Sequence, residues 1–198
     1  MTISAKDVMA LREKTGLSMM ECKKALMEAG GDEEKGMAIL KKRGLDKAAK
    51  KAERITGSGL IEAYSHDGRI GVLLEVLCET DFVARNEEFK QLAHDLALQV
   101  AAMNPLYTSP SHIPQEIVEE RKREFAEEAR TQGKPEAVVT KIVEGKLDRY
   151  CAEVCLLNQP FIKDQDKTAG DIVRSMIAKL GENITVSRFV RYVLGSYE

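Results

Sequence analysis

The residues of this chain with the most obvious chemical potential are three histidines and four cysteines. His66, His94 and His112 are scattered along the sequence, whereas a metal or catalytic site needs groups that converge. Cys151 and Cys155 lie one helical turn apart and could hold a metal with further ligands, but free cysteines more often pack as small hydrophobic residues. The sequence contains neither a Gly-rich phosphate loop nor a G-x-S-x-G elbow. We therefore predict a protein that is not an enzyme and that needs no cofactor or metal.

The segment that stands out physically is residues 78–86, Cys-Glu-Thr-Asp-Phe-Val-Ala-Arg-Asn. It lies between a predicted buried strand and a predicted helix, and short loops held at both ends by rigid elements often carry binding function. Phe82 and Val83 place apolar side chains at its tip, with Asp81 beside them. The residues alone leave two interpretations open. The segment is either a binding loop or a turn, capped by Thr80 or Asp81, whose Phe82 folds into the core.

A basic tract at residues 35–54 has eight Lys and Arg residues against two acidic ones. Such a tract could bind a phosphate backbone. Aromatic residues do not interleave with it, as a platform for base stacking would require. We therefore favour a solvated helix face followed by a tether, and we expect no direct contact with nucleic acid.

The composition excludes several classes of protein. The 198 residues include 30 Lys and Arg against 32 Asp and Glu, so the net charge is −2 and the surface as a whole is not built for nucleic acid. No apolar run approaches the length of a membrane span, and the first residues lack the apolar stretch of a signal peptide. The cysteines show no disulfide spacing, which is typical of the cytoplasm, and their role stays open; they are Cys22, Cys78, Cys151 and Cys155.

The elements that must position these residues begin with three short helices in residues 1–55, which we predict to form one small module with a basic tether. Ser4 with Asp7 predicts the first helix start, and residues 18–21 form a full S-x-x-E capping box for the second. A double glycine ends the second helix, and Asp32 can cap the third.

Residues 56–198 predict an α+β core, in which a small antiparallel sheet is packed with helices. Asp67-Gly68 between two apolar runs is a strong hairpin signal, and residues 70–77 are so apolar that we expect both of their faces to be covered. The predicted elements are a hairpin at 59–78, a helix at 87–103, a helical hairpin at 115–157, a helix at 169–180 and a strand at 184–194.

Several stretches together resemble the bacterial elongation factor Ts family. They are residues 11–16 (Leu-Arg-Glu-Lys-Thr-Gly), 19–26 (Met-Met-Glu-Cys-Lys-Lys-Ala-Leu), 80–84 (Thr-Asp-Phe-Val-Ala), 133–135 (Gly-Lys-Pro), 143–146 (Val-Glu-Gly-Lys) and 156–161 (Leu-Leu-Asn-Gln-Pro-Phe). Each stretch is weak alone, but their order and spacing are specific, and the resemblance covers nearly the whole chain.

The resemblance implies a guanine nucleotide exchange factor for elongation factor Tu. Such a factor binds Tu·GDP and promotes GDP release by perturbing the Mg²⁺ and phosphate site, so that GTP can rebind. The resemblance also implies that the N-terminal module has a UBA-like, three-helix fold. The residues it implicates in dislocating the partner's Mg²⁺ are Thr80, Asp81, Phe82 and Val83. Those implicated in binding Tu are Arg12, Met19, Met20, Asp81 and Phe82.

The chain lacks the second copy of the strand-rich unit that longer members of the family have. We therefore expect a homodimer, with the edge of the terminal strand or the helical hairpin as its interface. We expect no membrane partner. A general adaptor that binds proteins through the helical module, without exchange activity, is the alternative function.

Overall fold

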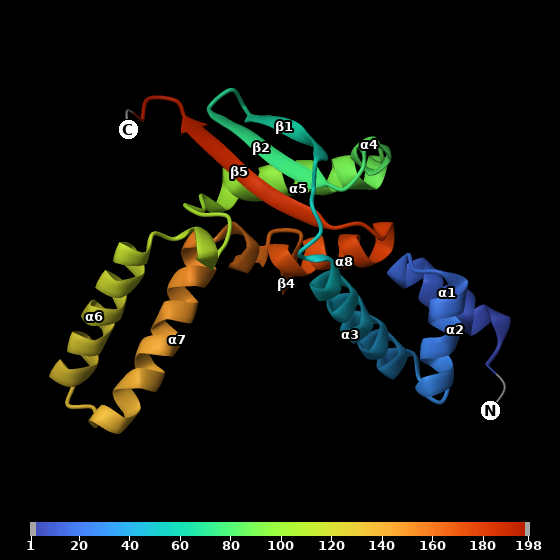
Figure 1. Ribbon diagram of the computed structural model, residues 1–198, viewed down its shortest axis with the longest axis horizontal. Helices are drawn as coiled ribbons and strands as arrows, with labels where there is room; N and C mark the ends of the chain where they lie inside the picture. The colour runs from blue at the N-terminus through green and yellow to red at the C-terminus, as the bar shows by residue number, and fades with distance from the viewer. Residues whose placement is uncertain (1–2, 197–198) are drawn as a thin grey trace. The chain divides into compact units, whose positions relative to one another are not determined.

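The computed structural model describes residues 3–196 (Figure 1). Its helices are α1 (Ala5–Thr15), α2 (Met19–Glu28), α3 (Glu33–Lys51), α4 (Asp81–Ala84), α5 (Glu87–Met103), α6 (Gln115–Thr131), α7 (Glu136–Val154) and α8 (Ala169–Leu180), with short 3-10 turns η1 (Pro110–His112) and η2 (Leu156–Asn158). Its strands are β1 (Ser58–His66), β2 (Ile70–Cys78), β3 (Pro160–Phe161), β4 (Asp164–Thr168) and β5 (Ile184–Val193). The α+β class expected from the sequence is confirmed.

Two compact units can be distinguished in the chain. The first combines the residues up to 60 with residues 76–92 and 173–185. The second combines residues 61–75 and 93–172 with the residues from 186 onward. Each unit is therefore assembled from stretches that are far apart in the sequence.

The three N-terminal helices begin where the capping residues predict. The Ser4 side chain accepts a hydrogen bond from the Asp7 backbone N–H, and the Asp7 carboxylate accepts one from Ser4, which completes a capping box. The side chains of Ser18 and Asp32 cap α2 and α3 by accepting hydrogen bonds from the backbone N–H groups of Glu21 and Lys35. The helices enclose a small core of Val8, Leu11, Cys22, Ala25, Leu26 and Leu40.

The basic tract lies on α3 and on the residues that follow it, and several of its cations are paired within the chain. Arg43 forms an ion pair with Glu28, and Lys47 forms one with Glu21. The Lys47 ammonium lowers the pKa of the Glu21 carboxyl. These contacts join α3 to α2, which fits the interpretation of the tract as a helix face better than a phosphate-binding surface.

The main sheet has three strands in the order β1-β2-β5. Asp67 and Gly68, both with positive φ, form the tight turn between β1 and β2 that the sequence predicts. Helix α5 lies against one face of the sheet, where the Glu62 carboxylate lies 2.9 Å from His94 Nδ1. The expectation that both faces of residues 70–77 are covered is wrong. Burial alternates along β2, and Leu73 on the other face is 48% exposed.

Helices α6 and α7 form the predicted helical hairpin and run side by side (Figure 1). Ala129 and Val139 are the side chains it buries most fully. The second helix ends at Val154 rather than near residue 157, because the chain turns there into η2. The two-stranded sheet β3–β4 that follows was not expected from the sequence.

Candidate functional site

The segment singled out by the sequence leaves the sheet at Cys78, the buried last residue of β2. The Cys78 thiol donates a hydrogen bond to the Thr80 carbonyl oxygen over 3.1 Å. Burial raises the pKa of this thiol, with the charge of Glu182 as the second cause, so the thiol keeps the proton that it donates. The segment is thus fixed to the end of the strand from its first residues.

Residues 81–84 form the single helical turn α4 rather than an irregular loop. Thr80 is its N-cap in an extended conformation (φ −128°), and its hydroxyl accepts from the Val83 N–H over 3.5 Å. At the other end the Arg85 guanidinium pairs with the Asp81 carboxylate over 2.9 Å. The prediction that Thr80 caps a turn, which belongs to the second of the two interpretations, is confirmed.

The side chain of Phe82 lies outside the core. It is 81% exposed, and no residue of α4 is buried. The interpretation that Phe82 folds into the core is therefore wrong. A large aromatic side chain held out on a short capped turn can insert into a pocket on another molecule.

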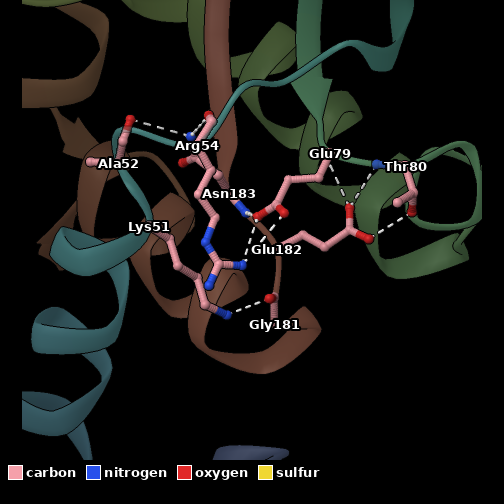
Figure 2. A network of polar contacts seen from close by, with 8 residues as sticks. All are labelled: Lys51, Ala52, Arg54, Glu79, Thr80, Gly181, Glu182 and Asn183. Atoms are coloured by element: carbon pink, nitrogen blue, oxygen red, sulfur yellow. Dashed lines mark hydrogen bonds and ion pairs between the residues drawn. The ribbon is translucent and has the colours of Figure 1, made fainter.

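Backbone and side-chain groups next to α4 converge on one carboxylate, that of Glu182, in the turn between α8 and β5 (Figure 2). The backbone N–H groups of Glu79 and Thr80 donate to its Oε2 over 3.1 and 3.0 Å. The Thr80 hydroxyl donates to its Oε1 over 2.6 Å. One side chain thus receives three hydrogen bonds from the residues that precede α4.

A second group of contacts connects the same turn to the segment that follows α3 (Figure 2). The Asn183 N–H donates to the Glu79 carboxylate over 2.6 Å, and the Asn183 amide donates to the Arg54 carbonyl over 2.9 Å. Arg54 Nη1 lies 3.4 Å from the Glu79 carboxylate. Lys51 donates to the Gly181 carbonyl, and burial lowers its pKa, with the charge of Arg54 as the second cause.

The other predicted site residues lie on the N-terminal helices. Arg12 is exposed on α1, and Met19 and Met20 begin α2 with 42% and 61% of their surface exposed. The contacts that hold residues 80–83 come from the turn between α8 and β5 rather than from these helices. The predicted site residues therefore lie on two separate parts of the first unit.

Sequence reasoning did not identify Glu182 or Asn183 as part of the site. Glu182 follows the glycine that ends α8 and resembles any exposed residue of a turn. Its partner Thr80 is 102 residues away in the sequence, so no local spacing signals the contact.

Two kinds of feature are absent from residues 3–196. These residues contain no group of three or more His, Cys, Asp and Glu side chains that could hold a metal ion. None of the helices among them is long and apolar enough to cross a membrane.

An exposed aromatic residue on a braced turn, together with small N-terminal helices that expose methionines, is typical of a protein-binding molecule, here of α+β fold. A sequence model of the family described as elongation factor Ts matches residues 33–196. The chain is 54% identical over 194 residues to the elongation factor Ts of Moorella thermoacetica, covering 98% of the chain and 96% of that protein. It is 52% identical to that of Thermosipho melanesiensis, covering 98% and 99%. The chain belongs to the elongation factor Ts family, as its sequence motifs predict.

Proposed function

We propose that this chain promotes the release of GDP from elongation factor Tu by means of residues 80–83, with Phe82 as the side chain that enters the partner. As a member of the elongation factor Ts family, the chain is a nucleotide exchange factor for elongation factor Tu and not an enzyme. It is a translation factor of the cytoplasm.

The observation that carries the proposal is the exposure of Phe82, 81% of whose surface is free on a turn held at both ends. Mg²⁺ and the phosphate loop make GDP binding tight in proteins of the partner's type, because the ion bridges phosphate oxygens and protein ligands. A factor that prefers the partner without this ion must weaken GDP binding by the same ratio, since coupling between two sites is reciprocal. Insertion of Phe82 beside the ion site would provide that preference.

The partner-binding surface that we propose also includes Arg12, Met19 and Met20. The two methionines are exposed at the start of α2, and methionine adapts to irregular surfaces. In this proposal the N-terminal helices supply affinity, while residues 80–83 supply the effect on the nucleotide.

The test is the release of a fluorescent GDP analogue from elongation factor Tu, measured with excess unlabelled GDP and catalytic amounts of the chain. We expect Phe82→Ala to slow release by roughly 30-fold, because truncation of a central aromatic residue costs about 2 kcal/mol. Affinity for Tu·GDP, measured by calorimetry, should fall less, because in this proposal Phe82 makes its contact only in the partner without the ion. Val138→Ala, at an exposed position of α7, is the matched control and should change neither quantity.

An unchanged release rate for Phe82→Ala would reject the insertion mechanism while leaving the exchange function in place. Absence of any acceleration by the parent chain would instead favour the adaptor without exchange activity.

We also propose that the chain forms a homodimer through the open face of the main sheet. Leu73 and Tyr192 are 48% and 70% exposed on β2 and β5, and Ile61 of β1 is 63% exposed. Leu73 and Tyr192 line a shallow hollow together with Ala63, Tyr64, Ser65, Gly71 and Val72. Exposed apolar surface of this kind marks interaction sites, and a second copy offers the same surface in return.

Light scattering during size-exclusion chromatography should give twice the chain mass of 22.0 kDa. A monomer at micromolar concentration would contradict the proposal.

The division into a helical module at residues 1–55 and a core at 56–198 is likewise a proposal. It is supported by the core that the three N-terminal helices form among themselves. The tether after α3 would then connect the two parts.

A further inference from the structure

The helix that carries Phe82 has only a weak apolar anchor of its own. None of the residues of α4 is fully buried, and only Val83 and Ala84 are half-buried, so burial of side chains contributes little to fixing its orientation. Within α4 itself, the Thr80 cap bond is long, at 3.5 Å, and the ion pair between Asp81 and Arg85 is exposed. The orientation of the turn therefore depends on the polar contacts made by the residues that precede it.

Glu182 supplies most of these contacts. Both of its carboxylate oxygens accept, one from the backbone N–H groups of Glu79 and Thr80 and the other from the Thr80 hydroxyl. Hydrogen bonds to an ionised acceptor are shorter and stronger than neutral ones, and the 2.6 Å bond to Thr80 is of this kind. The hydroxyl that caps α4 is thus itself oriented by Glu182.

The turn that carries Glu182 is also held in place. Asn183 is 4% exposed, and its amide donates to the carbonyl groups of Ala52 and Arg54. The backbone N–H of Asn183 donates to the Glu79 carboxylate. The turn after β2 and the turn between α8 and β5 thus each contribute a glutamate that accepts from the other's backbone. Glu182 therefore lies on a turn that is itself hydrogen-bonded to the segment after α3 (Figure 2).

We infer that Glu182 is a positioning residue for GDP release: it keeps the turn at residues 80–84 in the conformation that presents Phe82 to elongation factor Tu. This inference rests on the proposed role of Phe82. A turn that is already fixed in the binding conformation loses little conformational entropy when Phe82 inserts. A flexible turn adopts that conformation in only a fraction of the molecules, and only that fraction can insert Phe82. Loss of Glu182 lowers that fraction and leaves in place every residue that we propose to contact the partner.

The experiment compares Glu182→Ala, Glu182→Gln and the control Glu144→Ala in the full chain. Glu144 is an exposed glutamate of α7, so its variant matches the loss of charge. The measured quantities are the rate of GDP-analogue release from elongation factor Tu at saturating chain and the affinity for Tu·GDP, in which Phe82 is not yet inserted. We expect Glu182→Ala to slow release about tenfold while affinity changes less than about threefold.

Glu182→Gln should retain much of the activity, because its amide oxygen can still accept from the two backbone N–H groups. Glu144→Ala should behave as the parent chain does. Amide hydrogen exchange of the free chain supplies a readout independent of Tu, and in Glu182→Ala the amides of residues 79–84 should exchange faster while those of α5 do not.

Parent-like release by Glu182→Ala would overturn the inference. A slower release that merely follows a loss of affinity or of folded protein, as judged by thermal unfolding, would overturn it as well. Phe82→Ala is measured in parallel to separate the two hypotheses. If Phe82→Ala slows release and Glu182→Ala does not, only the positioning role fails. If Phe82→Ala has no effect, the insertion mechanism fails first.

Discussion

At the scale of single residues, Gly59 has very tight surroundings. Its φ is +152°, and a Cβ atom there would lie 2.2 Å from the Val76 carbonyl oxygen and 2.8 Å from Leu77 Cα. These neighbours are backbone atoms of β2, which cannot move aside without disturbing the hairpin. The chain therefore needs a residue without a side chain where β1 begins.

We predict that Gly59→Ala lowers the free energy of unfolding by about 2 kcal/mol or more, through strain and overpacking. Urea denaturation gives the value directly. Gly57→Ala is the matched control, because a Cβ atom at Gly57 meets nothing within 4 Å. Equal stabilities of the two variants would show that the backbone at residue 59 relaxes easily.

Cys155 is a second residue whose surroundings have a measurable consequence. Burial raises the pKa of its thiol to about 12, with the neighbouring Cys151 as the second cause. The unfolded chain loses this proton above about pH 8.5, before the folded chain does. The contribution of the protonated Cys155 thiol to the free energy of unfolding is therefore complete below about pH 8.5 and is lost as the pH rises towards 12.

We predict that the free energy of unfolding falls more steeply with pH in the parent chain than in Cys155→Ala. Between about pH 8 and about pH 10 the difference in the two declines should be about 2 kcal/mol. Guanidinium denaturation at the two pH values measures it, and titration of groups that do not contact Cys155 cancels in the comparison. Parallel declines would mean that the buried thiol ionises as easily as an exposed one.

At the scale of elements, α3 contains two glycines in different surroundings. A Cβ atom at Gly36 would lie 3.3 Å from Leu26 Cδ2, inside the helical core, whereas one at Gly44 would make an ordinary contact, 3.4 Å from Ala178 Cβ. Glycine inside a helix costs stability relative to alanine because it has more backbone freedom to lose.

We expect Gly44→Ala to stabilise the chain by about 0.5 to 1 kcal/mol. Gly36→Ala should gain less, since Leu26 must shift to make room. Thermal unfolding of both variants tests the order. A lower transition temperature for Gly44→Ala than for the parent would mean that the contact with Ala178 is tighter than ordinary packing.

The elements that the sequence predicts correctly are those with local signals. The starts of α1 and α2 follow from capping pairs three residues apart, and the β1–β2 turn follows from Asp67-Gly68. The open face of β2 could not be predicted in this way, because an apolar run is the same whether one or two layers cover it.

The candidate site likewise has a part with local sequence signals and a part that depends on tertiary contacts. Residues 80–83 were identified because they follow an apolar strand and match the motif of a family. The exposure of Phe82 was undecided, because it depends on whether other elements cover it. Glu182 was missed altogether, since its role exists only once α8 and β5 bring it to Thr80.

At the scale of the whole molecule, the open sheet face gives the proposed dimer a point at which it can be broken. We predict that Leu73→Glu converts the dimer to a monomer of 22.0 kDa, because two carboxylates would be buried without partners at a symmetric interface. Leu106→Glu is the control, since Leu106 is 60% exposed outside the sheet. Light scattering gives both masses, and dimers in both cases would place the interface elsewhere.

The separation of 102 positions between Thr80 and Glu182 also sets an order of events during synthesis on the ribosome. At typical elongation rates, Thr80 is synthesised about 5 to 20 seconds before Glu182. The nascent chain can form the β1–β2 hairpin and α5 in that interval, but the turn that carries Phe82 stays without its brace until Glu182 has been synthesised. An incomplete translation product that stops before α8 would thus display the aromatic side chain without the means to present it.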